Sequence, residues 1–119
     1  MRRYALLLAS GLLTAAPGLA LAQPTVPHSA VRAINLARNT AVQLNGGLSV
    51  YRPAQCMFQT GDADNPCLVA RNSNGFTFRF LGGGPGWQVL NEPANRETEI
   101  QISADGRTVK QVIYNGAPR

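Results

Sequence analysis

Residues 75–81, Gly-Phe-Thr-Phe-Arg-Phe-Leu, form the segment on which the predicted architecture rests. Its three phenylalanines alternate with a threonine, an arginine and a leucine, which is the period-two pattern of a β-strand with one apolar face. Three aromatic side chains on one face of a strand need a cover that excludes water. The preceding part of the chain supplies a candidate for that cover.

The candidate cover is a helix that we expect to begin at Ser29, its N-cap, and to run to Leu44. Its core-facing positions fall within about 60° of one another on a helical wheel. These positions are Ala30, Ile34, Ala37 and Ala41. Asn45-Gly46-Gly47 follows, and these residues tolerate the positive φ that a helix C-terminus requires. The small side chains should let the helix approach the phenylalanine face closely.

Several short strands are expected around this pair. Apolar or alternating segments occur at 48–51, 54–58, 67–71 and 87–90. The glycine-rich residues 82–86 are expected to reverse the chain. At the C-terminus, a turn at Asp105-Gly106 would pair Ile102 with Val109 and Ile100 with Gln111. The predicted fold class is therefore α+β, with one N-terminal helix packed on a curved antiparallel sheet of about five short strands and one disulfide bond.

This order is similar to the helix-then-meander plan of cystatin-like and PepSY-like small secreted domains, over residues 29–114. The cystatin glutamine-valine-glycine hairpin is missing, because Ile113 follows Gln111-Val112 where the glycine would stand. The similarity is one of layout, and it assigns no functional residue.

Cys56 and Cys67 are the only two cysteines, and we expect them to form a disulfide. The alternatives are two free thiols or half of a metal site. A metal site lacks ligands, because His28 is the only histidine and is distant in sequence. No metal ion and no cofactor are therefore expected.

Residues 1–22 have the features of a secretory signal peptide. Arg2 and Arg3 precede an uncharged apolar run from Ala5 to Ala16, and Ala20-Leu21-Ala22 has small residues where a signal peptidase cleaves. Cleavage near Ala22 would leave a periplasmic or secreted bacterial protein with no transmembrane segment.

The expected mature chain has three parts. Residues 23–28 form an extended leader, 29–115 a single α+β domain, and 116–119 a C-terminal tail. The whole chain has a net charge of +5. Loss of the two N-terminal arginines leaves nine basic and six acidic residues, so the mature chain is only mildly basic.

The sequence contains no credible catalytic set. His28 lies in the predicted leader, and two paired cysteines leave no thiolate nucleophile. We therefore expect a non-enzymatic exported domain that binds a protein or an envelope polymer. Tyrosine, tryptophan and basic residues on predicted strands and turns are the candidates for the binding face, because these types dominate interfaces. They are Tyr51, Arg52, Arg71, Arg79, Trp87, Lys110 and Tyr114.

Two other functions stay open. One is a small carboxylate-based hydrolase, which needs converging acidic side chains from among Asp62, Asp64, Glu92 and Glu99. The other is a binder of acidic polymers through arginines on the outer face of the sheet. Nucleic acid is not an expected partner, because Asn74 and Arg79 depart from the pattern of an RNA-binding strand.

Overall fold

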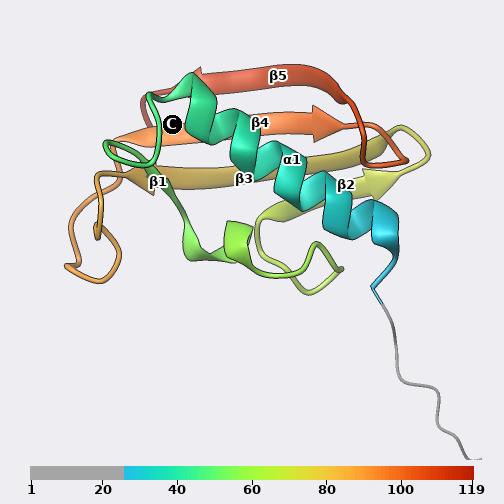
Figure 1. The fold of residues 1–119 in the computed structure, drawn as a ribbon, viewed down its shortest axis with the longest axis horizontal. Coiled ribbons are helices and arrows are strands. Elements are labelled where there is room, and N and C mark those ends of the chain that lie inside the picture. Colours follow the sequence, from blue (N-terminus) through green and yellow to red (C-terminus); the bar gives the residue numbers. More distant parts are fainter. Residues whose placement is uncertain (1–25) are drawn as a thin grey trace, which may run out of the picture.

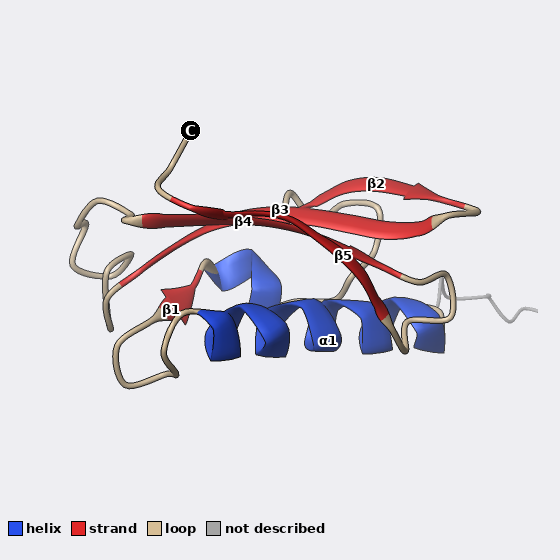
Figure 2. Cartoon of the chain, turned by 90° about the horizontal axis from the view of Figure 1, so that it is seen from above, coloured by secondary structure: helices blue, strands red, loops and turns tan. Residues whose placement is uncertain are grey.

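The structure, a computed structural model, describes residues 26–119. The predicted signal peptide, 1–22, and the first part of the leader lie outside the described residues. One long helix, α1 (His28–Leu44), lies across one face of an antiparallel sheet, as Figures 1 and 2 show from two directions.

The sheet has five strands, and β3 is paired on both of its edges. The strand order is β1-β3-β4-β5, with β2 also paired to β3. The strands are β1 (Arg52–Pro53), β2 (Leu68–Asn72), β3 (Gly75–Gly83), β4 (Arg96–Ile102) and β5 (Val109–Gly116). The predicted α+β fold class is confirmed.

The core lies between α1 and the inner face of the sheet. The three phenylalanines of β3 are buried there, together with Ile100 and Ile102 of the neighbouring strand. The buried face of α1 consists of Ala30, Ala33, Ile34, Ala37 and Ala41. The predicted pairing of an alanine-rich helix face with the phenylalanine face is therefore confirmed.

The helix begins one residue earlier than predicted. Pro27 is the N-cap, and its carbonyl accepts hydrogen bonds from the backbone N–H groups of Ala30 and Val31. No side chain caps this end, so the prediction of Ser29 as the N-cap is wrong. At the other end Gly46 and Gly47 adopt φ of +99° and +97°, as a glycine-rich helix terminus requires.

Three segments that the sequence predicts as strands form turns or a short helix in the structure. Residues 48–50 form a turn, and pairing starts only at Arg52. Residues 54–58 contain a 3₁₀ helix, η2 (Gln55–Phe58), which buries Met57 against α1. Residues 87–90 form a turn in which the Leu90 N–H donates to Gly86, a glycine at φ +77°. Segment 54–58 pairs its first backbone N–H groups with the Leu81 carbonyl and the Gln88 side chain, so it is held without forming a strand.

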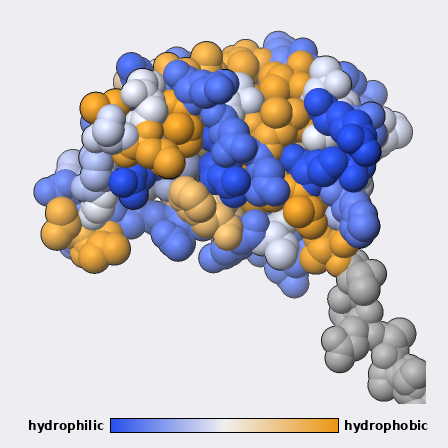
Figure 3. Space-filling model, in the orientation of Figure 1, coloured by the Kyte–Doolittle hydropathy of each residue, from blue (hydrophilic) through white to orange (hydrophobic). Residues whose placement is uncertain are grey.

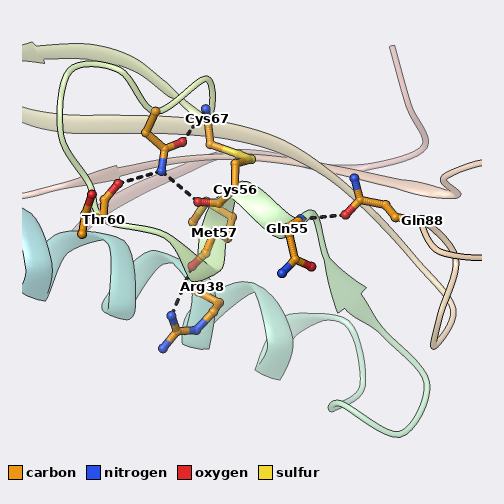
Figure 4. The surroundings of a disulfide bond; sticks show 8 residues. Arg38, Gln55, Cys56, Met57, Thr60, Cys67 and Gln88 are labelled. Carbon is orange, nitrogen blue, oxygen red and sulfur yellow. Dashed lines mark hydrogen bonds between the residues drawn. A yellow bond between two sulfur atoms is a disulfide. The ribbon is translucent and has the colours of Figure 1, made fainter.

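The predicted disulfide between Cys56 and Cys67 is confirmed, and it joins η2 to the start of β2 with 5.9 Å between the Cα atoms. The buried Asn65 sits beside it. Its Nδ2 donates to the carbonyls of Cys56 and Thr60 at 2.8 Å each, and its Oδ1 accepts the Cys67 N–H at 2.8 Å, the dashed lines at the disulfide in Figure 4. One amide side chain therefore fixes the whole connection from η2 to β2.

The pairing of β4 with β5 is partly as predicted. Ile102 pairs with Val109, but Ile100 pairs with Val112 instead of Gln111, because the register shifts by one residue between Ile102 and Gln101. The turn near Asp105 docks on α1, since the Arg32 guanidinium donates to the Asp105 carbonyl at 2.8 and 3.0 Å.

The predicted C-terminal tail is part of the fold. Residue 116 still belongs to β5, and Arg119 turns back onto the sheet. Its backbone N–H and guanidinium donate to the Glu97 carboxylate at 2.7 and 2.9 Å, and the guanidinium also donates to Glu99 at 2.9 Å. The same guanidinium lies 4.0 Å from the Tyr114 ring centroid.

We predict that Asn65→Asp destabilises the domain by about 2 kcal/mol, because a carboxylate would replace the donor amide and repel the two carbonyl oxygens that it binds. Asn72→Asp is the matched control, since the Asn72 side chain acts as an acceptor for the Asn74 N–H. That exposed variant should stay within about 0.5 kcal/mol of the wild type. Urea denaturation of the oxidised proteins measures both, and equal losses would contradict the bridging role of Asn65.

Glu97 makes stability depend on pH. The backbone N–H of Arg119, and then its guanidinium, hold the pKa of the Glu97 carboxyl below its ordinary value. A depressed folded-state pKa stabilises the domain above the unfolded-state pKa, about 4.3, and this contribution is lost as pH falls through the folded-state pKa.

We therefore predict that the unfolding free energy of the wild type falls more steeply than that of Glu97→Gln between about pH 6 and pH 3. The two proteins should converge at the acidic end, where the wild-type carboxyl is also neutral. Chemical denaturation at each pH measures the difference, and parallel pH profiles would refute the linkage.

Candidate functional site

The seven residues predicted to form a binding face are spread over the domain. Arg79 and Tyr114 lie on the outer face of the sheet, which α1 does not cover. Lys110 donates from Nζ to the carbonyl of Asn74, at the turn between β2 and β3. The outer face therefore does not gather the predicted set.

Two of the remaining candidates are held against the domain. Tyr51 is only 2% exposed, so the expectation that it lies on the surface is wrong. Its ring packs on β3, where a Cβ at Gly82 would lie 2.3 Å from Cε1. Arg71 extends over the ring of the buried Phe76, with 5.1 Å between its Cζ and the ring centroid.

Arg52 and Trp87 come together in one site. The Trp87 Nε1 donates to the Arg52 carbonyl at 2.9 Å, which joins the loop after β3 to β1. Both residues line an open groove of about 340 Å³, which we call the β1–η2 groove. It is lined by Arg52, Pro53, Gln55, Phe58, Gly86, Trp87, Gln88 and Val89.

The loop of residues 84–91, which forms one wall of this groove, is fixed by hydrogen bonds. Gln88 accepts the backbone N–H of Gln55 through Oε1 at 2.7 Å, a contact visible in Figure 4. Within the loop, Leu90 donates to Gly86 at 2.8 Å. The adjoining Glu92 donates to Trp87, also at 2.8 Å. The groove wall is thus preorganised by contacts to η2, to β1 and within itself.

Apolar side chains project from this wall and from the other side of the groove. Val89 is 91% exposed and Leu90 63% exposed, and Phe58 on η2 is 49% exposed. The loop of residues 45–51, with exposed Leu48 and Val50, lies at the same end of the domain in Figures 1 and 2. Figure 3 shows apolar surface at this end.

The outer face of the sheet is different in character. Arg79 and Arg119 share it with Glu97 and Glu99, and Arg119 is paired with both carboxylates. Opposite charges in equal number leave no basic surface there. The structure thus gives no support to a binder of acidic polymers that would use this face.

The acidic residues required by a hydrolase are separated. Asp62 and Asp64 lie in one loop, where the Asp62 carboxylate accepts the Asp64 N–H and the Thr60 hydroxyl. Glu92 is exposed at the end of another loop, and Glu99 is bound by Arg119. These carboxylates do not converge in a pocket.

Two carboxyl groups outside that set, those of Asp105 and Glu97, have a lowered pKa. The Ser103 hydroxyl and the Arg107 N–H lower the pKa of Asp105, as Arg119 does for Glu97. A general acid near neutral pH needs the opposite shift. Within residues 26–119, no three His, Cys, Asp or Glu side chains gather as a metal site would require.

The described part of the chain has no helix with the length and apolarity needed to cross a membrane. Sequence reasoning missed Phe58, Val89 and Leu90 as site residues, because it placed them in strands. The glycines and proline just before Trp87, and Pro93 after it, were the available signal for a loop instead.

Comparison with known proteins identifies no relative. No protein-family model, no curated protein and no solved structure matches this chain significantly.

Proposed function

We propose that the chain is an exported, non-enzymatic domain that binds a protein through the β1–η2 groove and the apolar loop beside it. The observation that carries this proposal is the exposure of Val89 and Leu90 on a loop held in place by hydrogen bonds. A fixed loop that keeps two branched aliphatic side chains in water is typical of an interaction site.

The groove has the composition of an interface. Trp87 and Phe58 supply aromatic side chains to its lining, which also includes the buried Pro53. Arg52 and Gln55 form a polar rim, which suits a contact with an apolar centre. Because the loop is already ordered, a partner would lose little affinity to ordering it.

A protein is favoured over an envelope polymer as the partner. The exposed side chains of the loop are aliphatic, and they gain most by burial against other apolar groups. A charged polymer would be recognised by clustered basic groups, whereas the arginines of the outer face are balanced by Glu97 and Glu99.

Export is part of the same proposal. The disulfide between Cys56 and Cys67 suits an oxidising compartment, and the sequence of residues 1–22 suits a cleaved signal peptide. The periplasm or the extracellular medium is the proposed location.

The binding site is tested with the double variant Val89→Ser/Leu90→Ser. We expect it to weaken binding of an affinity-captured partner by at least tenfold, because the loop is proposed to form the apolar centre of the interface. Val69→Ser is the control, since Val69 is an exposed aliphatic residue on β2, outside the groove. Surface plasmon resonance with the purified partner measures the change, and equal effects of the two variants would reject the site.

Export is tested by mass spectrometry of the protein expressed with its own N-terminus. We expect a first residue near Gln23 and no free thiol on Cys56 or Cys67. Treatment with a reductant before alkylation is the positive control for thiol detection. An intact Met1 to Ala22 segment on a reduced product would overturn the export part of the proposal.

A further inference from the structure

A second hollow, of about 290 Å³, lies at the C-terminal end of α1 and shares no lining residue with the β1–η2 groove. Its walls come from the end of α1, the loop before β1 and the start of β4. They are Asn45, Val50, Tyr51, Asn95 and Arg96. The lining contains one cation, two amides and a phenol but no acidic side chain.

The phenol of Tyr51 carries a hydroxyl that makes no hydrogen bond to any described residue, although the side chain is buried. The ring cannot easily turn away, because it lies directly on the backbone of Gly82. Burial raises the pKa of this hydroxyl, and the nearby Thr98 hydroxyl and the charge of Arg96 oppose that rise in part. The Thr98 hydroxyl donates to Asn115 instead, at 2.7 Å. At neutral pH the Tyr51 hydroxyl is therefore a protonated donor with no acceptor at hydrogen-bond distance among the described residues.

Arg96 is a cation that forms no ion pair with the described acidic residues. It is exposed, and it forms no ion pair or side-chain hydrogen bond with any residue from 26 to 119. It pairs with Gly82 in register, and strand alternation places it on the same face as Thr98, the face on which Tyr51 packs. Glu97 points to the opposite face, where Arg119 binds it.

The two asparagines play different parts. The Asn45 amide is occupied, since its Nδ2 donates to Ala41 and Asn115 and its Oδ1 accepts from Asn115. The side chain of Asn95 has no hydrogen bond within the described residues, while its backbone N–H is fixed to the Gly82 carbonyl at 2.9 Å. Asn45 is thus a rigid wall, and Asn95 offers a further donor.

We propose that this hollow binds the carboxylate of a small aliphatic acid or of a peptide C-terminus. The Arg96 guanidinium forms the planar fork that matches a carboxylate, with the Asn95 amide and the Tyr51 hydroxyl as additional donors. Val50, 59% exposed at the rim, contacts the aliphatic part of the ligand. The site needs no acidic group, and it contains none.

The first experiment titrates isotope-labelled, oxidised protein with isobutyrate and follows the backbone amide shifts. We expect saturable shifts at Val50, Tyr51, Asn95 and Arg96 with a dissociation constant in the millimolar range. Arg96→Gln should weaken binding at least tenfold. Arg79→Gln is the matched control, because Arg79 is another exposed strand arginine that forms no ion pair with a described residue, and it should bind as the wild type does.

Chloride and phosphate at equal ionic strength test for unspecific anion binding. If they give the same shifts as isobutyrate, or if isobutyrate gives no saturation, the proposal is overturned. A short apolar peptide with a free C-terminus and the same peptide as its amide distinguish the two ligand sources. If the free-acid peptide binds more tightly than isobutyrate and the amide does not bind, the ligand is a chain terminus. If the free-acid peptide binds only as tightly as isobutyrate, the ligand is a small acid.

The variant Tyr51→Phe separates a ligand role from a structural one. Because the hydroxyl has no partner in the domain, its removal should leave the stability of the ligand-free protein unchanged or raised while weakening isobutyrate binding several-fold. Tyr114→Phe is the control, since it loses a hydrogen bond to Ala117 on the outer face of the sheet, does not line the hollow, and should bind normally. A clear loss of stability in ligand-free Tyr51→Phe would show that the hydroxyl is bonded within the protein, and it would overturn its role as a ligand donor.

Discussion

The close packing of the small-residue face of α1 on β3 and β4 is the constraint on which the domain depends. Four alanines and Ile34 form the buried face of the helix, so the helix backbone can lie near the phenylalanines and isoleucines of the sheet. A larger side chain at any of these alanines would push the helix away and open the core. The helix α1 covers only one face of the five-stranded sheet, so the other face is exposed to water.

The chain closes the ends of this thin core with irregular structure. Beyond the C-terminus of α1, Tyr51 covers the backbone of β3 at Gly82, and Trp87 covers it at Gly83. Along the side of the helix, η2 buries Met57, and the disulfide and Asn65 hold it there. These segments are not paired as strands in the sheet. Side-chain hydrogen bonds and the disulfide hold them in place of the backbone hydrogen bonds between strands.

That division explains what the sequence could predict. The helix, β3 and the β4–β5 pair are elements with one buried face, and burial of one face imposes a visible period of 3.6 or 2. Segment 54–58 and segment 87–90 also contain apolar residues, but a tertiary bond such as Gln88 to Gln55 determines their conformation. A bond between residues 33 positions apart leaves no periodic trace in the sequence. The same holds for Asn65 and for the register shift in β5 that makes Val112 the partner of Ile100.

The candidate sites fall at the irregular end for a related reason. On the outer sheet face, Arg119 pairs with Glu97 and Glu99 and stacks on Tyr114, so the polar groups there already satisfy one another. At the end of the domain beyond α1, by contrast, aliphatic side chains stay in water. Within residues 26–119, Arg96 there has no acidic partner and the Tyr51 hydroxyl has no acceptor. Valine and leucine in a loop look like valine and leucine in a strand, and a buried tyrosine looks like an exposed one. Only the three-dimensional contacts separate the groups that stabilise the fold from the groups that are left for a ligand.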